Sequence, residues 1–230
     1  MKYKTQNWKK QRKSAIYNEI DYRCFIFCEG EKTEPHYFSS FKKLIEKNAI
    51  YKNTVQIEVK GLGLDTLRII YYAQDYITKN RIENAHIWCV YDKDDFPAED
   101  FNNVAYVAGS LNNRQDFLKY KVAWSNQCIE YWFVLHFEYY HSDNDRKHYI
   151  SFLNEKLSAL NLHKYEKNSE ETFNMLLKYG DPIKAIKHAK RRICDCSGQT
   201  PAQSAPATTV HELVEELAVF LPDGVRNRFI

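Results

Sequence analysis

The sequence contains few of the residues that dominate unfolded or fibrous proteins. Its 230 residues include only 7 Gly and 6 Pro, whereas 44% of the chain is apolar. This composition excludes disordered, collagen-like and low-complexity proteins, and the length suits one domain with additions. An excess of one charge is also lacking, because 33 basic and 30 acidic residues leave a net charge of +3. The overall charge therefore indicates no class of partner.

Long apolar runs and a secretory leader are absent as well. The densest apolar stretch, residues 131–135, has five residues, whereas a bilayer helix needs about 20. The N-terminus is polar and basic, unlike a secretory signal. We therefore expect a cytoplasmic protein with no membrane segment and with reduced cysteines. Zinc ligands usually have a two-residue spacing, which disfavours a metal interpretation of Cys24, Cys28, Cys194 and Cys196.

Strand and helix patterns alternate in the first half of the chain. The expected strands cover residues 23–28, 55–59, 87–91 and 120–124. The expected helices between them begin at Pro35 and cover 65–79 and 101–111. The runs 23–28 and 87–91 are uninterrupted, which is typical of strands covered on both faces. The alternation predicts an α/β fold, with a mainly parallel sheet of about four strands between helices.

The second half of the chain has helical patterns. An apolar helix is expected over 129–137 and another around 149–157, while Asp181 caps a basic helix that begins at Pro182. Thr209 and Glu212 predict a capping box at the start of the last helix. We divide the chain into a basic N-terminal arm (1–21), an α/β domain (22–138) and a helical C-terminal extension packed on it (139–230).

Acidic residues follow two of the expected strands directly. The two groups are Glu29 with Glu34, and Asp92 with Asp94 and Asp95. The carboxyl ends of parallel strands form the crevice in which ligands bind. If the two strands are neighbours, these like charges require a cation, and hard oxygen ligands favour Mg²⁺ or Mn²⁺. The alternative is that they are solvated loop acids, which composition alone favours.

Longer strings carry a resemblance to a known family. The pair E-G and D-x-D resembles the TOPRIM fold of topoisomerases, bacterial primases and OLD-type nucleases. The strings FCEGEKTEPHYF, VYDKDDF, VAWSNQCIEYWFVLHFE and PATTVHELV resemble the RloB family between about residues 22 and 220. This is a set of prokaryotic TOPRIM-containing proteins related to AbiL-type abortive-infection proteins and typically partnered with an ATPase in phage defence. The chain departs from the family pattern at Gln127, Ile129 and 205–208.

The resemblance implies a metal-dependent nuclease that acts as the toxic effector of phage defence. It makes Glu29 a metal ligand or general base, and Asp92 and Asp94 metal ligands. Asp95 and Glu34 become supporting groups or ligands of a second ion. OLD-type nucleases place a second-metal acid after a comparable strand, and Glu130 is the candidate here, although it equally fits a partly exposed helix residue.

A basic stripe lies on the expected helix after Pro182. Its members considered for nucleic-acid contacts are Lys184, Lys187, Lys190, Arg191 and Arg192. Alone, such a stripe is usually a solvent-facing surface, but beside a crevice that handles phosphate it favours backbone contacts. Lys184 is the first candidate for stabilising the charge of the transition state. The substrate is DNA or RNA, with tRNA among the candidates.

Other functions remain alternatives. The chain is too short for a topoisomerase clamp, and it shows no zinc or helicase-binding module of a primase. Gly61-Leu62-Gly63 lacks the Gly-Lys-Ser/Thr ending of a phosphate loop, so an ATPase partner must be a separate chain. The alternative from another class is an inactive TOPRIM binding module that docks on an ATPase and senses a phage product. The sequence leaves open whether one or two ions bind and whether the chain forms a homo-oligomer.

Overall fold

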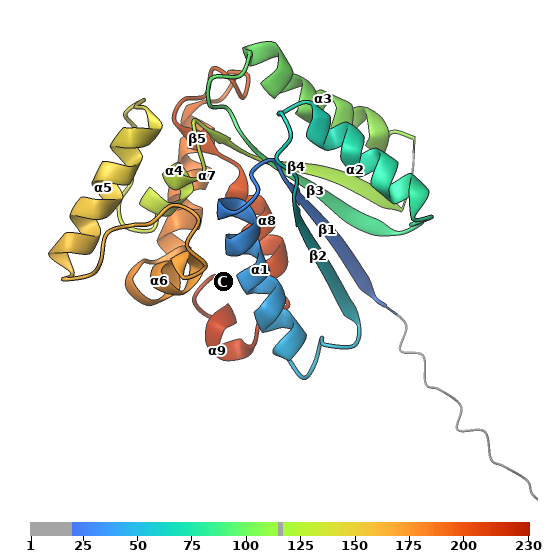
Figure 1. Ribbon diagram of the computed structural model, residues 1–230, viewed down its shortest axis with the longest axis horizontal. Helices are drawn as coiled ribbons and strands as arrows, with labels where there is room; N and C mark the ends of the chain where they lie inside the picture. The colour runs from blue at the N-terminus through green and yellow to red at the C-terminus, as the bar shows by residue number, and fades with distance from the viewer. Residues whose placement is uncertain (1–19, 115–116) are drawn as a thin grey trace, which may run out of the picture.

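A single five-stranded sheet organises the protein. The computed structural model describes residues 20–114 and 117–230 (Figure 1). The strands are β1 (Tyr22–Cys28), β2 (Val55–Gly61), β3 (Ala85–Asp92), β4 (Leu118–Asn126) and β5 (Ala207–Thr208). Their order is β2-β1-β3-β4-β5, with the first four parallel and β5 antiparallel to β4. The predicted α/β fold with a TOPRIM-like, mainly parallel sheet is confirmed, and the four predicted strands are the parallel ones.

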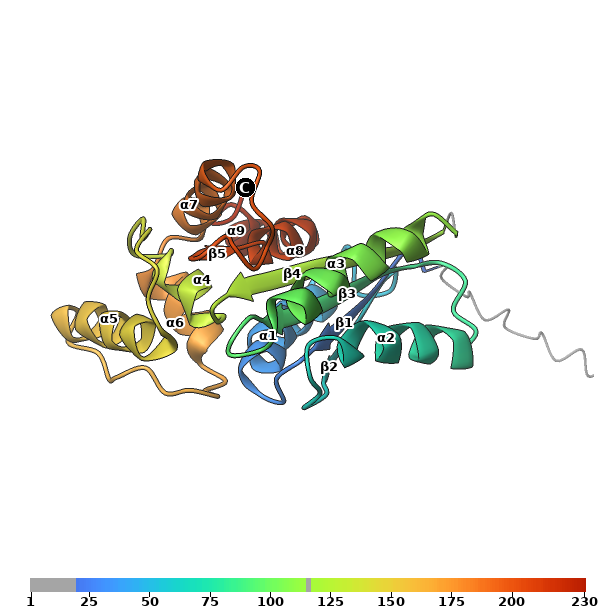
Figure 2. The ribbon, with the colours of Figure 1, turned by 90° about the horizontal axis from the view of Figure 1, so that it is seen from above.

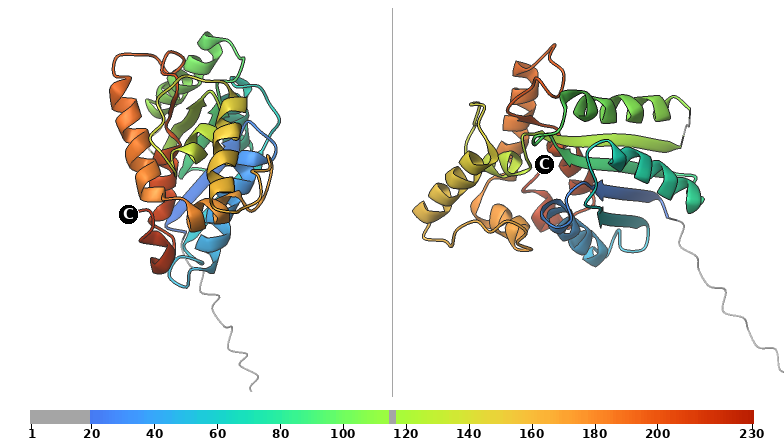
Figure 3. Two further views of the ribbon diagram at one scale, coloured as in Figure 1. Left: turned by 90° about the vertical axis from the view of Figure 1, so that its left-hand side faces the viewer. Right: turned by 45° about the horizontal axis from the view of Figure 1, so that its top comes forward.

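Helices cover both faces of the sheet. They are α1 (Thr33–Lys47), α2 (Arg68–Lys79), α3 (Ala98–Asn112), α4 (Glu130–Val134), α5 (Arg146–Ala159), α6 (Thr172–Tyr179), α7 (Pro182–Asp195), α8 (Val210–Ala218) and α9 (Asp223–Arg226). Helices α2 and α3 lie side by side over one face (Figure 3), while α1 and α8 contribute to the core on the other. Helix α5 lies at the margin of the molecule and packs on α4 (Figure 2).

The two hydrophobic cores explain why β1 is apolar over residues 24–28 and β3 over residues 87–91. In β1, Cys24, Ile26 and Cys28 face the core that contains α1, whereas Phe25 and Phe27 face the core that contains α2. Successive side chains of a strand point to opposite faces, so a strand covered on both sides needs apolar residues at every position. A sheet buried in this way leaves its strand ends as the place where polar side chains gather.

Several local predictions change or gain precision. Asp181 caps α7 by accepting a hydrogen bond from the Lys184 backbone N–H at 3.0 Å, as predicted. The predicted capping box at α8 is wrong, because Thr209 Oγ1 instead accepts from the Trp124 N–H across the sheet at 3.0 Å. The helix predicted over 129–137 is only the short α4, and its flanks are turns.

The predicted organisation also includes an N-terminal arm and a C-terminal extension. Residues 1–19 of the basic arm lie outside the described residues. The division at residue 138 between an α/β domain and a helical extension stays a prediction. Within 20–114 and 117–230, no helix is both long and apolar enough to cross a bilayer.

Candidate active site

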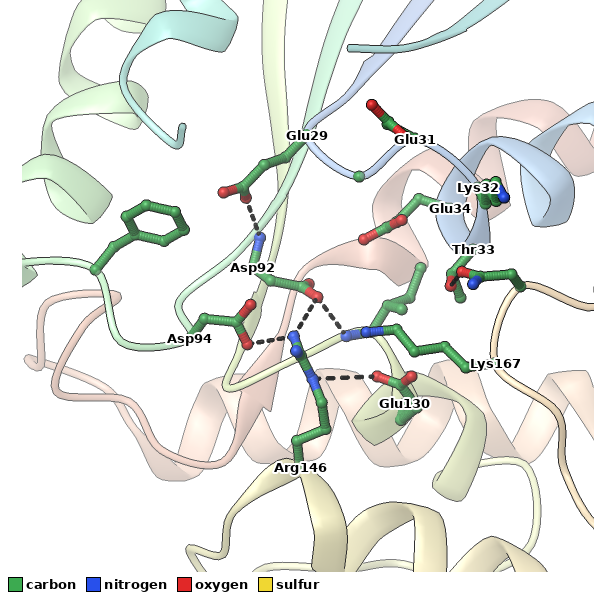
Figure 4. Close-up of a pocket in the computed structure, with 14 residues that line it drawn as sticks. Glu29, Glu31, Lys32, Thr33, Glu34, Asp92, Asp94, Glu130, Arg146 and Lys167 are labelled. Atoms are coloured by element: carbon green, nitrogen blue, oxygen red, sulfur yellow. Dashed lines mark hydrogen bonds and ion pairs between the residues drawn. The ribbon is translucent and has the colours of Figure 1, made fainter. Parts of the chain in front are cut away.

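The carboxyl ends of β1 and β3 border an acidic pocket of about 450 Å³ (Figure 4). The parallel register pairs Cys28 with Val90, and the Glu29 N–H donates to the Val90 carbonyl at 2.9 Å. As a result Glu29, 63 positions away in sequence, accepts a hydrogen bond from the Asp92 N–H at 3.0 Å. The charged side chains that line the pocket are Glu29, Glu31, Lys32, Glu34, Asp92, Asp94, Glu130, Arg146 and Lys167.

Glu29 directly follows β1, and two hydrogen-bond donors hold its carboxylate. One carboxylate oxygen accepts from the Asp92 N–H and the other from the Thr66 hydroxyl at 3.2 Å. Burial raises the pKa of Glu29 to about 7, although both hydrogen bonds act in the opposite direction. The charges of Asp94 and Glu34 add to the rise. A carboxylate with a pKa near neutrality can accept a proton and release it again, which general base catalysis requires.

Asp92, the last residue of β3, is a buried carboxylate with 5% of its surface exposed. Its Oδ2 accepts from the Ile129 N–H at 3.1 Å, but its Oδ1 is buried and has no hydrogen-bond partner among the described residues. Burial, reinforced by the charges of Glu34 and Asp94, raises the pKa of Asp92 well above its usual range. An orphaned carboxylate oxygen in a pocket is the mark of a group that awaits a ligand.

Asp94 reaches the pocket through a turn. Strand β3 ends at Asp92, so Asp94 is not carried by the strand itself. Instead Asp94 adopts a left-handed backbone (φ 37°), and its N–H donates to the Gln127 carbonyl at 3.0 Å. The preceding N–H, of Lys93, donates to Ser125 at 2.9 Å. The end of β4 therefore fixes the loop that carries Asp94.

Glu34 lies in the first turn of α1 with 6% of its surface exposed. Burial raises the pKa of Glu34, and the nearby charge of Glu130 adds to this, while Lys167 and Arg146 oppose it. Gly30 lies against the Glu34 carboxylate, and a Cβ at this position would collide with it. The glycine of the E-G pair is therefore the residue that lets Glu34 enter the pocket.

Glu130 occupies the first turn of α4 and is almost fully buried, with 1% of its surface exposed. It accepts a hydrogen bond from the Tyr165 hydroxyl at 3.2 Å, and Arg146 Nε lies 4.0 Å from its carboxylate. The interpretation of Glu130 as a partly exposed helix residue is wrong, because its side chain lines the acidic pocket.

Arg146 is a pocket residue that the sequence did not indicate. It is the first residue of α5, and its guanidinium pairs with Asp94 and lies 3.7 Å from Asp92 Oδ2 (Figure 4). Lys167 also extends into the pocket from the segment before α6. The one local signal was Asp145, whose side chain caps α5, but a cap does not reveal where a helix start lies in space.

Other predicted residues lie outside the pocket. Asp95 is exposed and lines a neighbouring cavity of about 540 Å³. Ser125 and Asn126, at the end of β4, do not cap α4. Ser125 Oγ is 3.1 Å from Thr208 Oγ1, and the Asn126 amide donates to the carbonyls of Pro201 and Ala202. These contacts fasten the end of β4 to the segment that forms β5.

The basic stripe lies on α7 and contributes no residue to the pocket lining. Lys184 is exposed and 3.6 Å from Asp181, Lys187 is exposed, and Lys190 pairs with Glu215 at 2.5 Å. Arg191 stacks over the Tyr139 ring, and Arg192 donates to the carbonyls of Ala205 and Pro206. The structure does not bring Lys184 to the acids, and its role in catalysis stays a prediction.

The chemistry of the pocket fits a hard divalent cation. Its donors are carboxylate oxygens, and the buried Oδ1 of Asp92 lacks a partner. Among residues 20–114 and 117–230, no three carboxylate, imidazole or thiolate groups already surround one point as ligands. Arg146 supplies positive charge between Asp92 and Asp94 instead. The residues that would hold Mg²⁺ or Mn²⁺ are Asp92 and Asp94, with Glu29, Glu34 and Glu130 in the same pocket.

One comparison with known proteins finds a match over the whole part of the chain that forms this site. A family model described as RloB-like protein matches residues 24–217, a range that contains every side chain lining the pocket. No curated protein and no solved structure matches the chain. The match spans well over half of the sequence and agrees with the resemblance carried by its four strings. The chain therefore belongs to the RloB-like protein family.

Proposed function

We propose that this protein is a nuclease that depends on Mg²⁺ or Mn²⁺ and hydrolyses phosphodiester bonds of DNA or RNA. The observation that carries the proposal is Asp92 Oδ1, a buried carboxylate oxygen without a partner, in a pocket shared with Glu29 and Asp94. Carboxylates held together against their repulsion favour a cation. A pocket at the carboxyl ends of parallel strands is also where α/β proteins bind their ligands.

The pocket residues have different roles in hydrolysis. A bound Mg²⁺ or Mn²⁺ ion would polarise a phosphate oxygen and lower the pKa of a water molecule. Asp92 and Asp94 are the ligands, because one has a free buried oxygen and the other lines the same pocket from the turn that follows β3. Glu29, with its pKa raised by burial to about 7, accepts the proton of the attacking water. Lys167 lines the same pocket and attracts the phosphate backbone.

We further propose that the nuclease is the toxic effector of a phage-defence pair. Membership of the RloB-like family supports this assignment, because the family resemblance implies a separate ATPase partner. The chain itself offers no phosphate loop, since Gly61-Leu62-Gly63 is not followed by Lys and Ser or Thr. Gly61 and Gly63 instead pack closely against Glu31 at the rim of the acidic pocket. ATP hydrolysis is therefore assigned to the partner.

Cleavage assays with matched variants test the nuclease. The purified chain is incubated in Mn²⁺ with tRNA, single-stranded DNA and duplex DNA, alone and with an ATPase encoded beside it. Glu29→Gln and Asp92→Asn are expected to lower cleavage by at least about a thousandfold, because each removes a group that acts in the transition state. Asp75→Asn, on the outer surface of α2, is the matched control and retains full activity.

Two results would contradict the nuclease. Equal cleavage by wild type and by both pocket variants would identify a contaminant. Absence of cleavage on all three substrates, with and without the ATPase, would favour the second function.

That second function is an inactive binding module that docks on an ATPase and senses a phage product. Two observations favour it: Arg146 already neutralises part of the acidic pocket, and no three ligands in the described chain surround one point. Expression of Asp94→Ala in cells separates the two functions. A nuclease loses its toxicity with this variant, whereas a scaffold keeps it.

A further inference from the structure

Arg146 has an unusual position for a helix-terminal arginine. Its guanidinium lies among three carboxylates: it pairs with Asp94, lies 3.7 Å from Asp92 Oδ2, and has its Nε 4.0 Å from Glu130. Two of them, Asp92 and Asp94, are the acids that would hold a divalent cation, and Glu130 lines the same pocket. The positive charge of Arg146 therefore occupies the position at which such an ion would be expected.

The fit between Arg146 and the acids is incomplete. Arg146 Nε is buried without a hydrogen-bond partner among the described residues, and the Oδ1 atom of Asp92 in the same pocket is also unpartnered. A donor and an acceptor are thus both unsatisfied in one small space. A guanidinium is planar, with its donors in a fixed fork, and cannot reach every oxygen around it. A small spherical ion has no such restriction.

Helix α5, which carries Arg146, is attached to the molecule at its margin. Its extensive backbone contacts within the described chain are with α4 alone, and its buried face consists of Tyr149, Leu153 and Leu157 (Figure 2). The acids, in contrast, are carried by β3 and by a turn anchored to the end of β4. Of the two sides of this ion pair, the arginine is carried by the more peripheral element.

We propose that Arg146 exchanges places with the divalent cation and then contacts the substrate. In the metal-free protein its guanidinium neutralises Asp94 and Asp92. When an ion takes these carboxylates, the guanidinium turns outward and pairs with a phosphate of the bound nucleic acid. An arginine fork matches a phosphate by two parallel hydrogen bonds, which makes it the stronger phosphate contact of the pocket. This inference rests on the proposed function, because it requires a cation at the acids.

Lys167 is the natural comparison for this role. It lines the same pocket and carries the same charge, but it forms no ion pair with a described carboxylate (Figure 4). Loss of Lys167 therefore reports the general effect of one positive charge on cation affinity. Substitution of Arg146 has that effect and, in addition, releases Asp92 and Asp94 from their ion pair.

Two affinities measured on the full-length chain test the exchange. Ca²⁺, a hard cation that takes oxygen ligands, is titrated by calorimetry, and a labelled single-stranded oligonucleotide is titrated by anisotropy in saturating Ca²⁺. Arg146→Gln is expected to bind Ca²⁺ about tenfold more tightly and the oligonucleotide about tenfold more weakly than wild type. Lys167→Gln is expected to change Ca²⁺ affinity by less than about threefold.

The opposite movement of the two affinities is the signature of the exchange, because an arginine that only supports the fold would weaken both. Arg146→Lys keeps the charge without the fork and gives intermediate values, which guards against a variant that fails to fold. Unchanged or weaker Ca²⁺ binding by Arg146→Gln, with normal binding by wild type, overturns the exchange alone. Absence of Ca²⁺ binding by every variant and by wild type overturns the proposed metal site, and the exchange with it.

Discussion

Two polar clusters with buried carboxylates lie on the same sheet and differ in how their oxygens are hydrogen-bonded. The first surrounds Glu216 of α8, toward the amino ends of the strands. Its oxygens accept hydrogen bonds from His86 at 2.8 Å, Trp88 at 3.0 Å and Lys121 at 2.5 Å, and from the Tyr22 hydroxyl. Burial acts to raise the pKa of Glu216, but these four donors outweigh it and lower the pKa to about 2.

The acidic pocket at the other ends of the strands provides fewer donors for each carboxylate, two for Glu29 and one for Asp92. Asp92 has one oxygen with no partner, and Glu29 has a pKa raised by burial to about 7. Both clusters are substantially buried, so burial alone does not separate them. The number of donors provided for each oxygen does. A carboxylate whose hydrogen bonds are complete stabilises the fold, whereas one left incomplete is available for a ligand at a cost in stability.

The largest expected effect comes from a substitution that disrupts the cluster around Glu216. Glu216→Gln keeps the shape of the side chain, but its amide NH₂ group faces donors such as Lys121 and Trp88. We expect the free energy of unfolding to fall by about 3 kcal/mol, since hydrogen bonds to a charged acceptor are lost in a partly buried site. Urea denaturation followed by circular dichroism measures the change.

Glu138→Gln is the control for this substitution. Glu138 forms a single exposed pair with Lys156 at 2.7 Å, and such pairs contribute roughly 0.5 kcal/mol. Equal losses from Glu216→Gln and Glu138→Gln would show that the Glu216 cluster is not a special stabilising element.

The dependence of stability on pH gives a second and smaller contrast. The pKa of Glu29 is raised from 4.5 to about 7, so the folded state binds this proton more tightly than the unfolded state does. In EDTA, the free energy of unfolding should therefore rise as the pH falls from about 8 to 5, with a contribution from Glu29 on the order of 2 kcal/mol. The pKa of Glu216 is lowered from 4.5 to about 2, so its stabilisation is present above pH 4.5 and is lost as the pH falls through about 2.

Glu29→Gln sharpens this contrast. The variant should lose the part of the rise between about pH 7 and 5 and keep the loss at low pH, because Glu216 is untouched. Denaturation curves at a series of pH values measure both limbs. A wild-type profile that is flat between pH 8 and 5 would show that Glu29 is not held in an unfavourable charged state.

Much of the fold could be predicted because its determinants are local in sequence. Apolar runs such as 23–28 and 87–91 have the pattern of strands buried on both faces, and the helices between them require parallel crossovers. Strand β5 was missed because it has two residues, 207–208, and exists only through pairing with β4. The prediction that Thr209 caps α8 was wrong for a similar reason, since its hydroxyl bonds to β4, which is distant in sequence, rather than to its own helix.

In the candidate site, too, only some residues could be predicted from local sequence. Glu29 and Asp92 follow directly from strand ends, because parallel topology brings the ends of neighbouring strands to one edge. Arg146 and Lys167 were not predictable, since their approach depends on how the segment after α4 folds back over that edge. The basic face of α7 was conspicuous in the sequence, but the topology placed none of its residues in the pocket lining.

The smallest expected effect is also the one with the opposite sign. Asp92→Asn keeps an oxygen to accept from the Ile129 N–H and removes a charge that lies near Glu29 and Glu34. In EDTA we expect the variant to be more stable than wild type by about 1 kcal/mol, because Asp92 is buried beside the like charges of Glu34 and Asp94, and an amide does not repel them. Added Ca²⁺ should stabilise wild type and leave the variant unchanged, since the variant lacks a ligand. A loss of stability in EDTA, like that expected for Glu216→Gln, would mean that Asp92 is as well satisfied as Glu216. The difference between the two clusters would then lie in position alone.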